Sequence, residues 1–145
     1  MAKDAVVRAI DVGYGNTKLV IGGDSQSISC MHFPSITPVS DEVGVTDALG
    51  TRRKTVAIPI GGLMYEVGPE AHLAAGIFNA RQMHDGFCET PEYLSLVRGA
   101  LHYMKVDRID LLVLGLPVAT FKIKKAALER TMTGTHELGR ASASR

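Results

Sequence analysis

Residues 9–21, AIDVGYGNTKLVI, decide the fold of this chain. Two runs of β-branched and aliphatic residues, 6–10 and 19–21, are too short for helices and predict strands. Between them lie two glycines and Asn16, residue types that tolerate a positive φ, so the stretch predicts a hairpin with a tight turn. Asp11 then stands at one rim of the turn and Lys18 at the other.

The chemistry of this turn suits a nucleotide phosphate. Glycines let backbone N–H groups approach phosphate oxygens closely, and Lys18 would add a positive charge. Asp11 would hold a hydrated magnesium ion, because Mg²⁺ keeps several waters and takes few carboxylates. The alternative is an ordinary hairpin whose charged residues are solvated, and a short motif does not by itself separate the two.

Two well-known phosphate loops are excluded by the spacing. A dinucleotide-binding loop needs a third glycine at the position of Lys18. A P-loop needs Gly-Lys-Ser/Thr at the start of a helix, whereas Lys18 follows Thr17 and begins a strand.

Length and composition indicate one folded domain. The chain has 145 residues, of which 46% are hydrophobic and 21% charged, and its net charge is +1. Such a balance gives no basic field and argues against direct binding of nucleic acid. The basic run at 52–54 is expected to be a solvated loop.

The cysteines, histidines and apolar runs exclude several other classes of protein. Cys30 and Cys88 lie among apolar or aromatic neighbours and are expected to be buried free thiols. The five histidines lack ligand-like spacing, so no metal site made of protein ligands alone is predicted. The N-terminus lacks a signal peptide's apolar region, and the longest apolar run, 111–119, is far shorter than the ~20 residues of a membrane span. We therefore expect a cytoplasmic protein without membrane contact.

A second hairpin is predicted at 55–67. Apolar residues alternate on both sides of the glycines at 61–62, and a two-residue turn there pairs Val56 with Val67 and puts the apolar side chains on one face. Pro59 marks the first of these strands as an edge. The preceding residues, 34–54, carry no periodicity and predict a long surface loop with room for a short helix at 41–49.

The other elements follow from periodicity and capping. Alternation at 27–33 predicts a strand that ends at Pro34 and completes an N-terminal meander, and a short helix is expected at 70–75. A turn-rich connector at 76–86 leads to a helix that begins with Thr90 as N-cap and continues to about Met104.

The C-terminal third begins with an apolar run at 111–116, which predicts a central strand buried on both faces. This strand ends at Gly115 and Pro117, at the rim of the expected ligand cleft. Thr120 is expected to cap a basic helix at 121–132, and the small, polar residues that end the chain predict disorder.

Three stretches, 10–18, 65–71 and 112–118, resemble the N-terminal half of the plasmid-segregation actin-like ATPases, the ParM/StbA type. The resemblance implies an α/β, actin-like ATPase (ribonuclease H-like) domain with a mixed five-stranded sheet, flanking helices and an inserted β-hairpin subdomain. It places this domain at 1–134, with the insertion at about 34–76 and a disordered tail at 135–145.

The resemblance also implies a function. Members of that family bind ATP with Mg²⁺ between two homologous domains and form filaments that move plasmids through an adaptor protein bound to DNA. By position, Asp11 and Lys18 would be the catalytic residues, with Asp11 orienting Mg²⁺ through water and Lys18 neutralising the β- and γ-phosphates. The residues implied to bind the cofactor are Asp11, Gly13, Tyr14, Gly15, Asn16 and Lys18.

One feature of that family is missing, because residues 19–145 contain no second Asp-x-Gly-x-Gly loop. We therefore expect the chain alone to be half of an ATP clamp, with weak or undetectable nucleotide binding and no turnover. Two alternatives remain open: a non-polymerising actin-fold domain of the sugar-kinase or activator kind, and a non-enzymatic module that binds filament ends or the adaptor. An apolar surface left by the missing half would also allow self-association, for example as a dimer.

Overall fold

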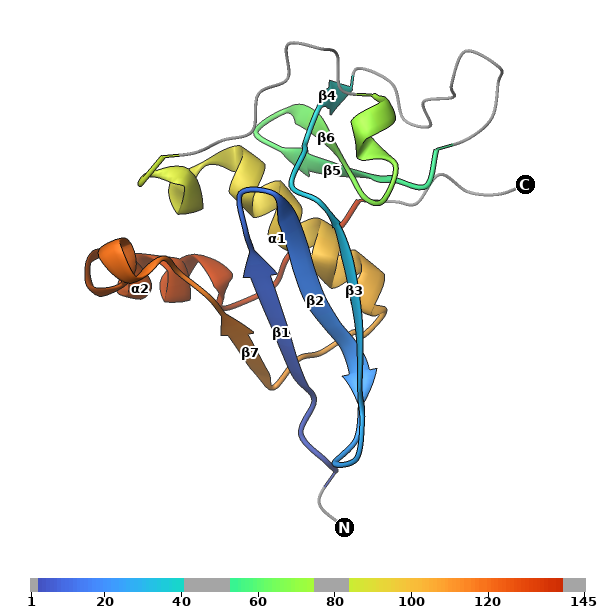
Figure 1. Ribbon diagram of the computed structural model, residues 1–145, viewed down its shortest axis with the longest axis vertical. Helices are drawn as coiled ribbons and strands as arrows, with labels where there is room; N and C mark the ends of the chain where they lie inside the picture. Colours follow the sequence, from blue (N-terminus) through green and yellow to red (C-terminus); the bar gives the residue numbers. More distant parts are fainter. Residues whose placement is uncertain (1–2, 41–52, 75–83, 140–145) are drawn as a thin grey trace.

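The computed structural model describes residues 3–40, 53–74 and 84–139, which form two β-sheets with a long helix between them (Figure 1). The main sheet is mixed and has the strand order β3-β2-β1-β7. Its strands are β1 (Val7–Val12), β2 (Asn16–Gly23), β3 (Ile28–Pro34) and β7 (Leu111–Leu114).

Pairing in the main sheet confirms the predicted meander. β2 lies antiparallel to both β1 and β3, whereas β7 joins β1 in parallel. In the part of the chain that the structure describes the sheet has four strands, one fewer than the five expected.

The second sheet contains the predicted hairpin, β5 (Val56–Ile60) and β6 (Leu63–Val67). Its register is the expected one, with Val56 opposite Val67, and β5 is an edge strand. Gly61 and Gly62 have φ values of 58° and 82°, the left-handed backbone of a two-residue hairpin turn, which glycine adopts readily. A short strand that was not predicted, β4 (Val39–Ser40), pairs with β6. The helix considered at 41–49 falls outside the described residues.

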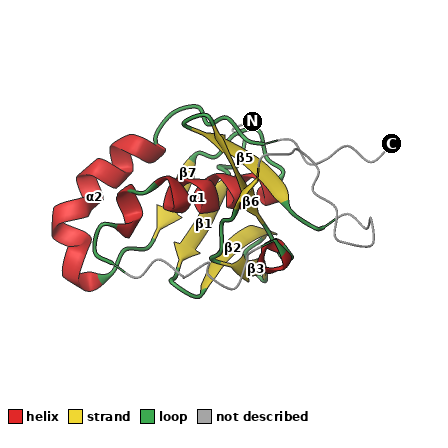
Figure 2. Ribbon diagram, turned by 90° about the horizontal axis from the view of Figure 1, so that it is seen from above, coloured by secondary structure: helices red, strands yellow, loops and turns green. Residues whose placement is uncertain are grey.

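Helix α1 (Pro91–Met104) joins the two sheets into one core, as Figure 2 shows. The Thr90 hydroxyl accepts a hydrogen bond from the backbone N–H of Tyr93, so the predicted cap is confirmed. Gly99 allows close packing on the hairpin, because a Cβ there would overlap the side chain of Val67. The fully buried side chains of this core come from both sheets and from the helix: Ile10, Phe33, Val56, Ile58, Leu96 and Val97.

Two expectations for the C-terminal third are wrong. β7 is an edge strand of the described sheet, and Leu111 and Val113 are 56% and 50% exposed, because only the α1 side of this sheet is covered. Helix α2 (Val118–Met132) begins three residues early, with Pro117 as N-cap, because extended backbone at the proline leads straight into the first turn. The Thr120 hydroxyl instead donates to the carbonyl of Pro117.

The prediction of a solvated loop at 52–54 is wrong for Arg53. Arg53 is buried and forms a two-armed ion pair with Glu66 of β6, with distances of 2.8 Å and 3.2 Å. The carboxylate of Glu66 points inward, and the guanidinium of Arg53 is buried because it pairs with this carboxylate. Arg53 therefore stabilises the hairpin subdomain. Lys54 is exposed, as expected for the whole run.

The remaining segments are short. The helix expected at 70–75 is a single 3₁₀ turn, η1 (Ala71–Leu73), and another, η2 (Phe87–Glu89), precedes α1. Both cysteines are free, but Cys30 is exposed because it lies on the uncovered face of the main sheet, and Cys88 is only partly buried. Of the tail expected to be disordered, 135–145, residues 135–139 contain no regular element and 140–145 lie outside the described residues. Among the described residues, no helix is long and apolar enough to cross a membrane.

Candidate functional site

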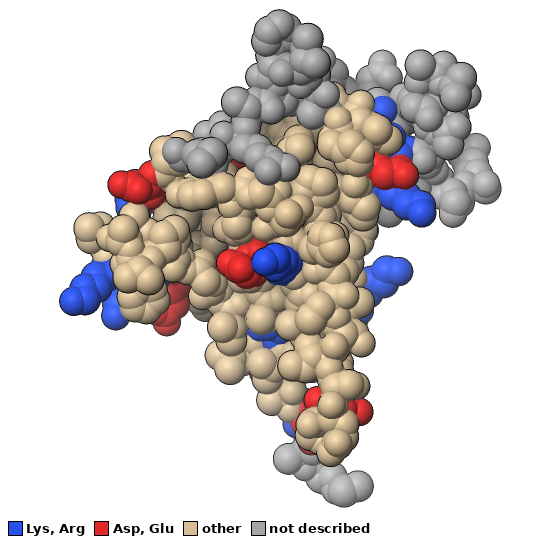
Figure 3. All heavy atoms as spheres, viewed as in Figure 1, with Lys and Arg blue, Asp and Glu red and all other residues tan. Residues whose placement is uncertain are grey.

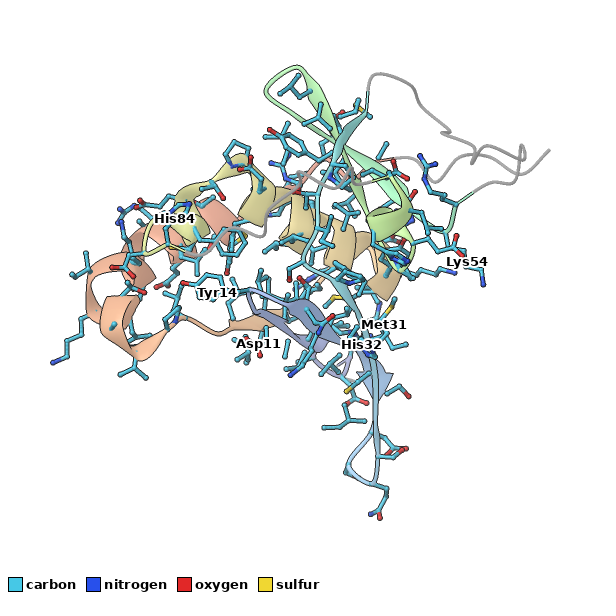
Figure 4. The ribbon with its side chains drawn as sticks, turned by 45° about the horizontal axis from the view of Figure 1, so that its top comes forward. Asp11, Tyr14, Met31, His32, Lys54 and His84 are labelled. Atoms are coloured by element: carbon cyan, nitrogen blue, oxygen red, sulfur yellow. The ribbon has the colours of Figure 1, made fainter. Side chains whose placement is uncertain are left out.

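The candidate site surrounds residues 13–16, the turn between β1 and β2 together with the first residue of β2, which we call the glycine loop. Asp11 and Lys18 are directly opposite each other in the antiparallel pairing of the two strands, so both side chains lie on the same face of the sheet. Both are exposed, and no ion pair joins them. Figure 4 shows Asp11, Tyr14 and His84 around this end of the sheet. The structure thus brings together an unpaired carboxylate and an unpaired ammonium group.

The glycine loop is held by Ser35, which follows β3. The Ser35 hydroxyl donates to the carbonyl of Gly13 at 2.6 Å, and its backbone N–H donates to the carbonyl of Gly15 at 3.0 Å. The hydroxyl also lies 3.0 Å from that of Thr17, and both side chains are buried. Neither Gly13 nor Gly15 has a positive φ. The loop is therefore shaped by hydrogen bonds from Ser35 and not by left-handed glycines.

These bonds decide which backbone donors of the loop are available. The N–H of Gly13 is used inside the turn, where it donates to the carbonyl of Asn16 at 3.0 Å. The N–H groups of Tyr14 and Gly15 have no acceptor among the described residues. Two adjacent free N–H groups at a loop tip form a small anion-binding site.

Two cavities meet at Asp11. The first, which we call the loop cavity, has a volume of about 270 Å³ and lies between the glycine loop, the start of α1 and the end of β7. The second, the outer groove, has a volume of about 470 Å³ and runs along the uncovered face of the main sheet past Lys18 and Val113. Figure 3 shows that this side of the molecule is largely uncharged. Asp11 lines both cavities, whereas Lys18 lines only the outer groove.

The residues that follow β7 form the floor beneath Asp11. A Cβ at Gly115 would lie 3.3 Å from Oδ1 of Asp11, closer than most real contacts, so the glycine leaves room for the carboxylate. Leu116 and Pro117 continue the lining of the loop cavity. The end of β7 therefore lies at the rim of this cavity, next to Asp11 and the glycine loop.

An aromatic cluster forms the other wall of the loop cavity. The ring of Phe87 lies 5.8 Å from that of Tyr14 and 5.5 Å from that of Tyr93, edge to face in the second pair. The Tyr14 hydroxyl donates a long hydrogen bond, 3.5 Å, to the carbonyl of His84. The tip of the glycine loop is thus packed against the segment that leads into α1.

Two ionisable groups of this wall are kept neutral. Burial, with smaller contributions from Cys88 and Asp11, raises the pKa of Tyr93 to about 12. Burial, together with the charge of Glu89, also raises the pKa of the Cys88 thiol. Both groups are therefore protonated at neutral pH, and the acidic side chains that line this cavity are those of Asp11 and Asp85.

The site's residues fit a hydrated magnesium ion better than a directly bound metal. In the described parts of the chain, no group of three or more His, Cys, Asp or Glu side chains could hold a metal ion. Asp11 supplies one carboxylate without a hydrogen bond of its own, and the Tyr93 hydroxyl in the same cavity is buried without a partner. Mg²⁺ needs few carboxylates and contacts proteins through its waters, so this set of groups suits it.

Sequence reasoning missed three contributors. Ser35 follows a strand that was correctly predicted, but the sequence carries no sign that its hydroxyl reaches back to Gly13. Tyr93 matched the apolar stripe of α1 and was assigned to packing, as its burial also suggests. Phe87 lies between the predicted connector and the predicted helix, where no pattern was available.

The chain matches a protein family over residues 9–144, and the family is described as the N-terminal domain of actin-like proteins. The chain therefore belongs to the actin-like proteins and adopts their fold. The fold class predicted from the three sequence motifs is confirmed.

Two solved structures are similar to this domain. One is Ta0583, an archaeal actin homolog, with 26% identity and a TM-score of 0.62 over 86% of this chain. The other is the apo ParM protein of pSK41, with 13% identity and a TM-score of 0.60 over 89% of this chain, a likeness that shows the fold alone. The chain spans 37% and 42% of the lengths of those two structures. No curated protein matched the chain.

Proposed function

We propose that this domain provides one side of a Mg-ATP site in an actin-like protein. The observation that carries the proposal is the glycine loop itself, with unpaired Asp11 and Lys18 opposite each other at its base and the free N–H groups of Tyr14 and Gly15 at its tip. Such a loop can position a triphosphate and offset its charge, which is most of what catalysis of phosphoryl transfer requires.

Each residue has a defined part in this proposal. Lys18 offsets negative charge on the β- and γ-phosphates, and the two free N–H groups of the loop donate to phosphate oxygens. Asp11 accepts hydrogen bonds from the waters of Mg²⁺, which supplies further neutralisation when bound. Asn16 is exposed beside the tip, where its side-chain amide can add a donor.

The site is open, because these contacts come from one side only. A single glycine loop encloses neither the base and sugar nor the far side of the phosphates, so most of a nucleotide would stay in water. We therefore propose millimolar binding of Mg-ATP and no turnover by this chain alone, with tighter binding only where an opposing domain supplies the second phosphate loop.

A titration with two readouts tests the proposal. Millimolar Mg-ATP should shift the amide resonances of Tyr14 and Gly15, and Lys18→Ala should abolish the shift, while calorimetry at micromolar nucleotide records no heat. Lys105→Ala is the control, because Lys105 is an exposed lysine at the far end of α1. If the loop amides do not respond to Mg-ATP, the proposed nucleotide site is wrong. If calorimetry gives a micromolar Kd, the proposal that this chain alone binds Mg-ATP only weakly is wrong.

We also propose a cytoplasmic protein of the plasmid-segregation, ParM/StbA type, which assembles into filaments with ATP and binds an adaptor protein on DNA. The support is the set of sequence motifs together with the actin-like fold. Light scattering by a protein that carries both phosphate loops should rise on addition of Mg-ATP. A flat trace would favour the non-polymerising sugar-kinase or activator branch.

Self-association through the outer groove is a second candidate, and one observation favours it. The uncovered face of the main sheet exposes Val7, Leu111 and Val113 by 46%, 56% and 50%, and the outer groove on this face, which Val113 lines, is mainly apolar. Val113→Lys would disrupt such an interface. Sedimentation of the wild type as a monomer at high concentration would exclude it.

A further inference from the structure

The hydroxyl of Tyr93 is a buried polar group without a role in the fold. Tyr93 is 2% exposed, its ring packs edge to face on Phe87, and its oxygen has no hydrogen-bond partner among the described residues. A phenylalanine would make the same ring contacts without leaving a polar atom unsatisfied. Because a buried unsatisfied group destabilises a fold, the hydroxyl calls for an explanation outside the packing.

A second tyrosine on the same helix shows what a structural hydroxyl looks like. Tyr103, three turns further along α1, is also largely covered, and its hydroxyl donates to the carbonyl of Val67 at 3.4 Å. Tyr103 therefore ties α1 to the hairpin subdomain. The hydroxyl of Tyr93 has no such acceptor among the described residues, and Tyr93 lines the loop cavity.

The loop cavity also contains a complementary group. Asp11 lines this cavity as well, and its carboxylate has no hydrogen bond or ion pair with any described residue. Gly115 beneath it leaves the carboxylate oxygens uncovered. The two groups thus line one cavity of about 270 Å³, which has room for water molecules.

We propose that the Tyr93 hydroxyl is a further ligand-binding group of this site, whose oxygen accepts a hydrogen bond from a water of the hydrated Mg²⁺ held by Asp11. A water on Mg²⁺ uses its lone pair for the metal and presents two hydrogens. One of them can be donated to the carboxylate and the other to a neutral phenol oxygen. The inference rests on the proposed function, because it places Tyr93 in the same Mg-nucleotide site.

Removal of the hydroxyl alone tests the inference. Tyr93→Phe should weaken binding of Mg-ATP, followed by the amide resonances of Tyr14 and Gly15, by about two- to twelve-fold, the loss expected for one net hydrogen bond. Binding of ATP in the presence of a chelator should not change. Without ligand, the unfolding midpoint of Tyr93→Phe should equal or exceed that of the wild type. The matched control, Tyr103→Phe, should lower the midpoint and leave Mg-ATP affinity unaltered.

The outcomes separate this inference from the proposed function. If the wild type fails to respond to Mg-ATP, both are overturned. If the wild type responds and Tyr93→Phe binds Mg-ATP equally well, only the role of Tyr93 is overturned. A lower unfolding midpoint for Tyr93→Phe, like that expected for Tyr103→Phe, would also overturn it, because the hydroxyl would then be structural.

Discussion

Replacement of Ser35 by alanine is expected to loosen the glycine loop without unfolding the domain. The hydroxyl of Ser35 makes two contacts, one to the carbonyl of Gly13 at 2.6 Å and one to the hydroxyl of Thr17 at 3.0 Å. Alanine removes both and leaves the buried Thr17 hydroxyl without its partner. Thr17 is fully buried, so water cannot replace the lost bond there.

The magnitude follows from these two bonds. Each contributes about 0.5–1.5 kcal/mol to the free energy of unfolding, so the variant should lose about 2 kcal/mol. For a domain of this size that loss corresponds to a fall of about 4–8 °C in the unfolding midpoint. The backbone N–H of residue 35 still donates to Gly15 in the variant, so the loop is loosened and not released.

Amide hydrogen exchange measures the local effect, and thermal unfolding measures the global one. The N–H of Gly13, which donates to Asn16, should lose protection in Ser35→Ala, while amides in the middle of α1 keep theirs. Ser95→Ala is the control, because it removes a buried serine hydroxyl that bonds only the carbonyl of Glu92 within α1. Unchanged exchange at Gly13, or equal stability losses in both variants, would refute the assignment of Ser35 as the residue that holds the loop.

Three further changes probe the packing and electrostatics of the domain. Gly99→Ala should destabilise by about 1–3 kcal/mol in denaturant unfolding, because its Cβ would overlap Val67, and a neutral result would mean that α1 and the hairpin separate easily. Glu66→Ala should cost about 3–5 kcal/mol, because it removes the carboxylate from the buried Arg53 guanidinium, whereas a loss below about 1 kcal/mol would contradict burial of the pair. Burial lowers the pKa of His102 in the folded state below its value of about 6.5 in the unfolded chain. The neutral imidazole therefore contributes its full stability above about pH 6.5, and this contribution is lost as the pH falls through the folded-state pKa. Urea unfolding at several pH values should therefore show a steeper acid loss for the wild type than for His102→Gln; parallel profiles would rule this out.

Local patterns predicted most of the elements correctly because each carries its own signal. Alternation and a glycine pair determined the register of the second hairpin, and Thr90 with Pro91 marked the start of α1. The tight turn predicted between Asp11 and Lys18 is also present, and the structure adds that the two residues are paired across the strands. These features depend on neighbours within a few residues, so the sequence specifies them directly.

Errors arose where the environment is made by distant segments. The apolar run of β7 was expected to be central, but whether a strand is covered depends on what packs on each face, and its outer face is uncovered in the described chain. Arg53 looked like a solvated loop residue because the carboxylate that buries it comes from β6, beyond the turn of the hairpin. Cys30 was expected to be buried for the same reason, since its neighbours in sequence do not determine its neighbours in space.

The amino-acid sequence by itself determined the hairpin, the glycine loop between Asp11 and Lys18, and the actin-like class of the domain. Only the tertiary structure decided how that loop is held and what faces it. Ser35 reaches the loop because β3 lies beside β2, and Tyr93 lines the same cavity as Asp11 because α1 packs on the main sheet. The physical reason is the sequence distance over which each feature is determined. Turn preferences and periodicity depend on residues close together in the sequence, whereas the hydrogen bonds of Ser35 and the walls of the loop cavity need groups that only the folded chain brings together.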